Sequence, residues 1–135
     1  MRNFINYTNH PSANWSEAQR QAAQLYGEIM DMDFPEIEPH WNESQVFSLA
    51  YQQAQQIIAL KPAAVLVQGE FTFSYALISL LQQADIRVVA ACSQRCTESV
   101  INEKQETIRR SVFKFVRFRQ YLSCELYSDD ECAKI

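Results

Sequence analysis

Glycine is scarce in this chain, since only Gly27 and Gly69 occur among its 135 residues. No glycine-rich dinucleotide fingerprint and no Walker-type phosphate loop is present. A serine nucleophile elbow and a paired-carboxylate motif are missing as well. Function therefore has to be argued from the order of elements and from the loops that join them.

An excess of positive charge is also missing, because the formal net charge is -4 and the sequence pI is about 5.1. This balance argues against binding of long nucleic acid through a broad basic field, although a small anionic ligand needs only a few local donors. No apolar run approaches the roughly 18 residues of a membrane span, and the first residues do not read as a signal peptide. We expect a cytoplasmic protein without a membrane partner.

The cysteine and histidine residues show no metal-ligand spacing. The four cysteines are Cys92, Cys96, Cys124 and Cys132, and the two histidines are His10 and His40. These positions match no zinc pattern, so we expect neither a metal nor another cofactor. Reduced thiols are the default expectation for all four cysteines.

The stretch 63–81, AAVLVQGEFTFSYALISLL, is the one around which the chain is organised. A short apolar run at 65–67 predicts a buried strand, and the apolar pattern that follows predicts a helix to Leu81. Gly69 stands at the corner between them, which suggests a positive φ or the close approach of a ligand. A plain strand-to-helix turn is the alternative.

The remaining pattern alternates strands and helices. Strands are predicted at 2–7, 28–34 and 86–92, and helices at 16–26 and 42–60. Together with the central strand and helix they predict a three-layer, Rossmann-like α/β fold with a mostly parallel sheet. We expect a single domain over 1–121 and an acidic tail over 122–135.

A C-terminal antiparallel hairpin is predicted after Ser93, from strands at 97–101 and 109–121. By a period of two, one face of the second strand would carry Phe113, Phe115, Arg117, Arg119 and Tyr121. The two arginines of that face have a plain alternative role as the solvated polar positions of a strand.

The candidate site lies where the loops after the first and third strands meet. If these two strands are neighbours, then loops 8–12 and 68–72 face each other at the switch point, with a turn at 93–95 beside them. Neutral donors are Asn9, Gln68, Thr72, Ser74 and Ser93, the cation is Arg95, and the acid or base candidates are His10 and Glu70. Such a set suits a ligand that bears phosphate.

Each charged candidate has a simpler role. His10 precedes a proline and suits a turn, Glu70 suits a carboxylate that matches a helix dipole, and Arg95 suits a solvated turn cation. The spacing from Cys92 to Arg95 is too short for the loop of a cysteine phosphatase, which argues against a cysteine nucleophile.

The segments VQGEFTFSYALISLL, ACSQR and VFKFVRFRQY, with the opening NYTNHPS, resemble small CRISPR-associated proteins with a CARF-like Rossmann fold. The likeness covers about 4–121. It implies a type III CRISPR protein of antiviral defence that binds a cyclic oligoadenylate, most simply cyclic tetra-adenylate, as a homodimer. The acidic tail departs from the pattern, which leaves the dimer surface undefined.

Carried onto this sequence, the resemblance places ligand-binding groups on three segments. They are Asn9 in the first loop, Gln68, Gly69, Glu70, Phe71 and Thr72 in the central turn, and Ser93 after the fourth strand. It also implies a ring nuclease without a metal, in which the ribose 2′-hydroxyl attacks the neighbouring phosphate. Arg95 would then stabilise the developing charge and His10 would accept the proton.

Three other functions fit the same residues. A non-catalytic cyclic oligoadenylate binder, a sponge or sensor, would use the same cleft. A nucleoside-transferring enzyme would use Glu70 to support a ribosyl cation. A structural interaction protein would need no ligand at all.

Overall fold

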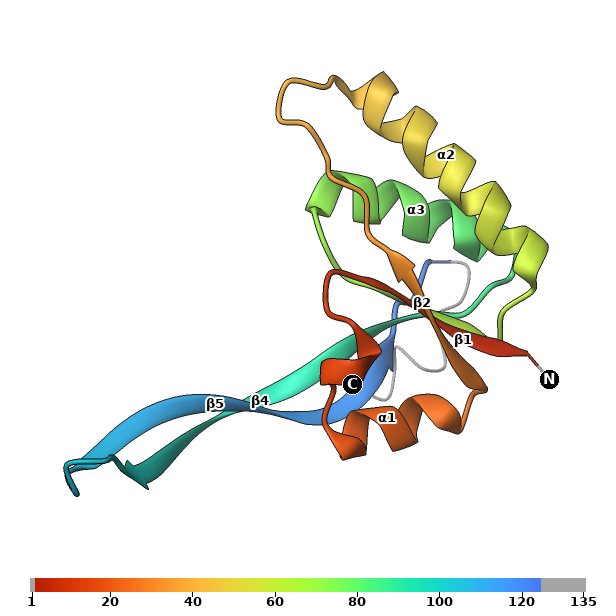
Figure 1. Ribbon diagram of the computed structural model, residues 1–135. Coiled ribbons are helices and arrows are strands. Elements are labelled where there is room, and N and C mark those ends of the chain that lie inside the picture. Colours follow the sequence, from red (N-terminus) through yellow and green to blue (C-terminus); the bar gives the residue numbers. More distant parts are fainter. Residues whose placement is uncertain (1, 125–135) are drawn as a thin grey trace.

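A five-stranded mixed sheet organises the computed structural model, which describes residues 2–124 (Figure 1). The strands lie in the order β2-β1-β3-β4-β5. The pairs β1/β2, β1/β3 and β3/β4 are parallel, whereas β4 and β5 are antiparallel. The α/β class, the mostly parallel sheet and the C-terminal antiparallel pair are confirmed, as is the contact between the first and third strands.

The elements follow the expected order with shifts of a few residues at their ends, except that the expected strands 86–92 and 97–101 form one strand. The strands are β1 (Asn3–Thr8), β2 (Glu28–Asp33), β3 (Ala64–Val67), β4 (Val88–Ile101) and β5 (Thr107–Gln120). The helices are α1 (Glu17–Gln24), α2 (Glu43–Leu60) and α3 (Phe71–Gln83), and a short 3-10 turn, η1, covers Ser12–Asn14.

Two apolar layers flank the sheet because alternate strand residues point to opposite faces. On one face, Ile5 and Tyr7 of β1 join Val65 and Val67 of β3 in a core closed by α2 and α3. On the other face, a smaller core forms around the strand residues Phe4, Ala64, Leu66, Val89 and Phe118, with Ala23 of α1 and Trp15. The expected three layers are therefore present (Figure 1).

The predicted helix starts are confirmed by side-chain caps. The Ser16 hydroxyl accepts a hydrogen bond from the Gln19 backbone N–H at α1. At α2, Asn42 and Gln45 form a reciprocal capping box. These bonds satisfy backbone donors that a helix start leaves without a partner.

The structure explains the glycine at position 69 by crowding and not by the positive φ that the sequence suggested. Neither glycine has a positive φ. A Cβ at Gly69 would overlap the ring of Phe34, so the close neighbour is the protein's own aromatic core. The expectation of positive φ is wrong. The crowding by Phe34 explains the glycine without a ligand.

The expected turn at 93–95 is wrong, and the hairpin strand expected at 97–101 is the outer part of a longer strand. Instead, β4 continues from Val88 to Ile101 and pairs with β5 over its whole length. The outer parts of this pair, 93–101 and 107–115, form a two-stranded ribbon that projects from the sheet, and we call it the arm (Figure 1). Pairing with β5 supplies backbone hydrogen bonds to polar residues that would otherwise favour a turn.

The predicted faces of β5 are also wrong at one end, because a β-bulge interrupts the pairing. Cys92 pairs with Arg117 and Ser93 pairs with Phe115, which leaves Val116 as an extra residue. An extra residue shifts the alternation by one, so Phe115 and Phe118 point to the same side although they are three residues apart. Both pack in or against the core beneath α1.

No helix in residues 2–124 is long and apolar enough to cross a membrane. Most of the expected acidic tail, including Cys132, lies outside the described residues.

Candidate functional site

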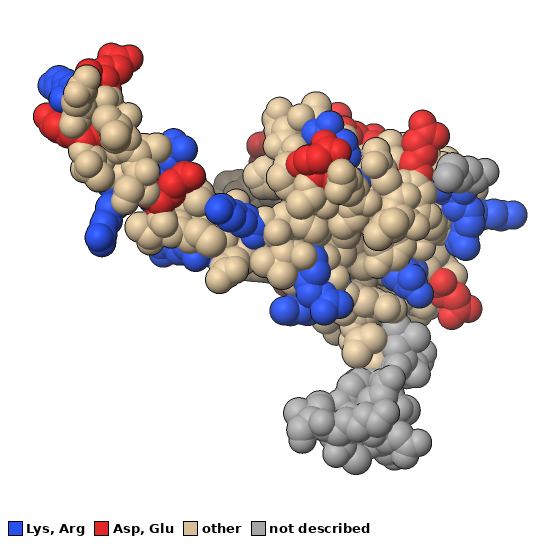
Figure 2. All heavy atoms as spheres, turned by 90° about the horizontal axis from the view of Figure 1, so that it is seen from below, with Lys and Arg blue, Asp and Glu red and all other residues tan. Residues whose placement is uncertain are grey.

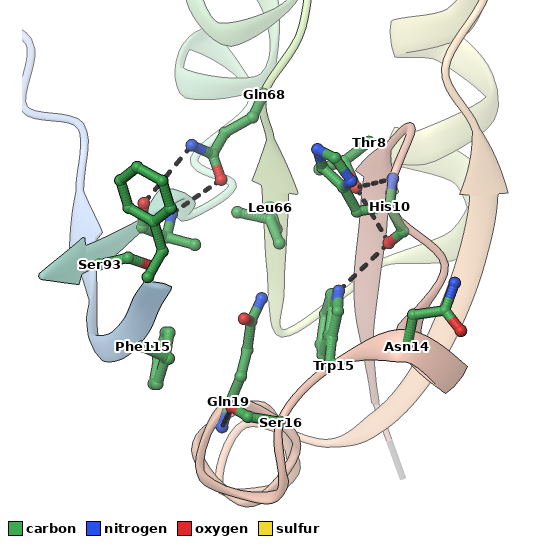
Figure 3. Close-up of a pocket in the computed structure, with 12 residues that line it drawn as sticks. Thr8, His10, Asn14, Trp15, Ser16, Gln19, Leu66, Gln68, Ser93 and Phe115 are labelled. Atoms are coloured by element: carbon green, nitrogen blue, oxygen red, sulfur yellow. Dashed lines mark hydrogen bonds between the residues drawn. The ribbon is translucent and has the colours of Figure 1, made fainter. Parts of the chain in front are cut away.

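A pocket lies at the carboxyl ends of β1 and β3, where β4 runs on past its parallel pairing with β3, on the side of the sheet covered by α1 (Figure 3). Its volume is about 390 Å³. The lining residues are Thr8, His10, Asn14, Trp15, Ser16, Gln19, Leu66, Gln68, Ala91, Ser93, Phe113 and Phe115. Ligands of open α/β sheets bind at such a position, where neighbouring crossovers run to opposite faces.

Aromatic rings form much of the pocket wall. Trp15 is buried, and its ring lies 6.4 Å from the ring of Phe118. Phe115 is half-buried and packs 4.9 Å from the same Phe118 ring. Phe113, by contrast, is 72% exposed and lies where the pocket meets the arm. The pocket therefore has an aromatic floor, formed by the buried Trp15 and the half-buried Phe115, and a more exposed aromatic edge at Phe113.

The first loop is held in place by hydrogen bonds to the backbone carbonyl of His10. Asn6 Nδ2 donates to it at 2.9 Å, and Trp15 Nε1 donates to it at 3.2 Å. Asn6 Nδ2 also donates to Asp31 Oδ1, and Asp31 Oδ2 accepts from the Ser12 hydroxyl at 3.0 Å. This network ties the loop to β2 and fixes the pocket wall before any ligand arrives.

Gln68 extends the sheet beyond the end of β3. Its Oε1 accepts from the Ala91 N–H at 3.1 Å, and its Nε2 donates to the Ala91 carbonyl at 3.4 Å. The side chain thereby stands in for a backbone partner of β4. The amide lines the pocket but has its polar atoms directed to the backbone (Figure 3).

Gln19 of α1 offers the amide that is best placed for a ligand. Figure 3 shows this side chain rising from α1 between Trp15 and Phe115 into the cavity. Within residues 2–124 the side-chain amide of Gln19 makes no hydrogen bond, and the bond to the Ser16 hydroxyl comes from its backbone N–H. The rings can stack on a flat heterocycle, and the amide beside them can form hydrogen bonds with the edge of that heterocycle.

The pocket brings together only part of the predicted site. His10, Gln68 and Ser93 line it, and no hydrogen bond among the described residues involves the His10 imidazole. The other predicted binding residues do not line it, namely Asn9, Gly69, Glu70, Phe71 and Thr72. Gly69 packs against Phe34, Glu70 caps α3, and Phe71 and Thr72 line a separate surface between α2 and α3.

Glu70 caps the start of α3. Its carboxylate accepts from the backbone N–H groups of Thr72 and Phe73 at 3.0 and 2.8 Å, and from the Thr72 hydroxyl at 2.7 Å. Desolvation acts to raise the pKa of Glu70, but these hydrogen bonds favour the carboxylate and together lower the pKa. The carboxylate has the helix-start role that was the alternative to catalysis.

Arg95 lies on the arm, outside the pocket lining. It pairs with Phe113 across the two strands, and paired residues of an antiparallel ladder share a face. Its Nε and Nη2 donate to the Ser111 hydroxyl at 3.1 and 3.0 Å. The guanidinium is therefore held at Ser111, two residues farther out along β5 than Phe113 of the pocket edge.

Sequence reasoning missed Asn14, Trp15, Gln19, Phe113 and Phe115 as pocket residues. In the sequence, Trp15 and Gln19 indicate only a helix start. The signal that could have found them is position, because a helix after the first strand must start near that strand's carboxyl end. The two phenylalanines reach the pocket only because β4 and β5 are so long.

A comparison with protein families finds one match that spans most of the chain. The model of the uncharacterized protein MJ1673 family matches residues 2–119, which include the pocket, the arm and all of the sheet except Gln120. No curated protein matches the chain at a significant level.

Proposed function

The chain belongs to the uncharacterized protein MJ1673 family, and because this name states no activity, we propose a function from the site and the CARF-like resemblance. The proposed function is to bind a cyclic oligoadenylate in the pocket beneath β1, β3 and β4, as a protein of type III CRISPR antiviral defence. Cyclic tetra-adenylate is the first candidate ligand.

The observation that carries this proposal is the position of Gln19. A glutamine amide can pair with adenine through both its donor and its acceptor, at N6 and N7. The amide lies between Trp15 and Phe115, whose rings can enclose a base. The other uncharged polar groups of the pocket, such as Ser93, suit ribose hydroxyls.

Ring cleavage is the second candidate, and the His10 imidazole at the pocket favours it. In this step the imidazole takes the proton of a ribose 2′-hydroxyl, and the 2′-oxygen attacks the adjacent phosphorus. The bond to the 5′-oxygen breaks, that oxygen gains a proton, and a 2′,3′-cyclic phosphate remains on the linear product. Arg95, on the side of the arm that carries Phe113, supplies positive charge for the phosphate.

Glu70 does not fit the nucleoside-transfer alternative well. Its two oxygens are engaged at the start of α3, and the side chain does not line the pocket. A ribosyl cation held by the aromatic rings would therefore have no contact with this carboxylate.

The test combines binding and product analysis on the purified protein in EDTA. Thermal shift and chromatography are measured with cyclic tri-, tetra- and hexa-adenylate, and with cyclic tetra-uridylate as a ligand of equal charge. We expect cyclic tetra-adenylate to stabilise the protein. Gln19→Ala should weaken binding about 10-fold or more, in line with a bidentate base contact. Gln24→Ala, on the same helix and outside the pocket, should leave binding unchanged.

Three outcomes separate the candidates. A stabilised protein with an intact ring means a binder. Linear product whose formation is lost in His10→Ala while binding is kept means a ring nuclease. Equal binding of the uridylate ring, or no binding of any ring, refutes the proposed function. Calorimetry adds the stoichiometry, and a homodimer that shares one ring would give one ring per two chains.

A further inference from the structure

We infer that the arm continues the pocket as a surface for phosphates, so that the ligand is an oligonucleotide of several residues and not a mononucleotide. This inference depends on the proposed function, because it extends the same site. One base occupies the pocket, and the phosphates next to it contact Arg95 and then Arg109 along the arm.

Charge along the chain is strongly segregated, although the net charge is negative. Seven of the twelve Lys and Arg residues lie between Arg95 and Arg119, where only three acidic residues occur. They are Arg95, Lys104, Arg109, Arg110, Lys114, Arg117 and Arg119. Figure 2 shows Lys and Arg side chains along the arm. By the strand pairing, Arg95 and Arg109 lie on the pocket side of the arm. Two cations on one side can hold a short anionic chain but are too few for a long nucleic acid.

The pairing of the two strands decides which basic residues face the pocket. Ser93 and Phe113 line the pocket, and Arg95 is the strand partner of Phe113. Arg95 is also two residues beyond Ser93, which is about 7 Å along a strand and on the same side of the pleat. Arg109 pairs with Ser99 and so follows on that side, farther from the sheet.

The guanidinium of Arg95 is oriented by the protein and keeps N–H donors accessible to a phosphate. Two of its nitrogens donate to the Ser111 hydroxyl, and no other hydrogen bond of its guanidinium occurs within residues 2–124. The side chain is exposed, so its remaining N–H donors are accessible to phosphate oxygens. Holding the guanidinium in place reduces the entropy lost when it binds.

Phe113 joins the two parts of this surface. Its ring is exposed between the pocket and Arg95, where a second base can stack. Stacking on aromatic side chains beside a positively charged track is the way proteins bind single-stranded nucleic acid. The sequence of contacts from Gln19 through Phe113 to Arg95 therefore fits consecutive nucleotides of one ligand.

The opposite face of the arm provides the matched controls. Lys114 pairs with Gln94, next to the pair of Arg95 and Phe113, and points to the other side. Arg110 also lies on that side and forms an ion pair with Glu98 at 3.2 Å. Lys114→Ala removes one positive charge from the same part of the arm without removing a contact on the pocket side.

The experiment compares adenosine, linear tetra-adenylate without terminal phosphates, and cyclic tetra-adenylate by titration calorimetry at several salt concentrations. Adenosine measures the pocket alone, because it carries no phosphate. We expect Arg95→Ala to weaken both oligonucleotides about 10-fold and to leave adenosine binding unchanged. The slope of log affinity against log salt should fall by about 1 in this variant. Lys114→Ala should change oligonucleotide affinity by less than about 3-fold.

The results separate this inference from the function on which it depends. If adenosine binds and requires Gln19, but Arg95→Ala and Lys114→Ala lose equal oligonucleotide affinity, the arm acts only through its overall charge and the inference is wrong. If the oligonucleotides bind no more tightly than adenosine, the inference is also wrong while the pocket stands. If neither adenosine nor any oligoadenylate binds, the proposed function itself fails.

Discussion

Phe113 should contribute much to ligand binding and little to stability, and Phe118 of the same strand should do the reverse. Phe118 is 8% exposed and packs against Phe4, with ring centroids 5.0 Å apart. Truncating such a buried phenylalanine to alanine costs about 3–5 kcal/mol of unfolding free energy. Phe113 has only about a quarter of its surface covered, and complete burial of a phenylalanine is worth about 1.5–3 kcal/mol. Phe113→Ala should therefore cost less than about 1 kcal/mol.

The affinity for cyclic tetra-adenylate should show the opposite effect for Phe113. Loss of one stacked base costs about 1–3 kcal/mol, which corresponds to a loss of about 5- to 150-fold in affinity. Unfolding is measured by urea denaturation and binding by calorimetry, on both alanine variants. Two results would refute the reasoning: a Phe113→Ala protein as unstable as Phe118→Ala, which would make Phe113 a core residue, or an unchanged affinity, which would remove its stacking role.

Further predictions concern the core, a buried tyrosine and a helix start. Gly69→Ala should destabilise the protein by about 1–3 kcal/mol through its overlap with Phe34, and adding Phe34→Leu should recover part of the loss in denaturation experiments. Burial raises the pKa of Tyr7, so the stability that its neutral phenol contributes is complete below the unfolded pKa of about 10 and falls as the pH rises further. Tyr7→Phe should therefore lose less stability than the parent protein in urea midpoints measured from about pH 8 to 11. An equal alkaline loss in both proteins would contradict this linkage. Glu70→Ala should cost about 1 kcal/mol by removing the cap of α3 while leaving ring affinity unchanged, and a loss of affinity equal to that of Gln19→Ala would give Glu70 a ligand role.

The layered core could be predicted because hydrophobic period and cap chemistry are local signals. The run 65–67 is apolar throughout, as expected for a strand covered on both faces, and all of β3 is buried. Asn42 and Gln45 predicted the start of α2 by their spacing alone. These local patterns predicted the layers and the mostly parallel sheet, whereas the contact between β1 and β3 entered only as a condition, which the structure meets.

The outer hairpin could be predicted, but the continuous arm could not, because its inner strand residues depend on their partner strand. The segment 93–95 is polar and ends the apolar run before it, so by itself it favours a turn. Only pairing with β5 makes it a strand, and the bulge at Val116 is invisible to a count of alternating residues. Arg95 was expected in a loop for this reason, and Phe113 and Phe115 were not connected with the pocket.

The bulge affects the bend of the arm without affecting the side to which each of its side chains points. Without Val116, Phe115 and Arg117 would still pair with Ser93 and Cys92, now in an unbroken ladder. Every side chain of the arm would keep its side, but the bend and extra twist that a bulge introduces would disappear. The bend and twist that the bulge adds to the arm thus depend on one residue, independently of the side chains that the arm carries. Gain or loss of a residue at this point can therefore re-aim the arm in evolution, or in a designed variant, without exchanging its two faces.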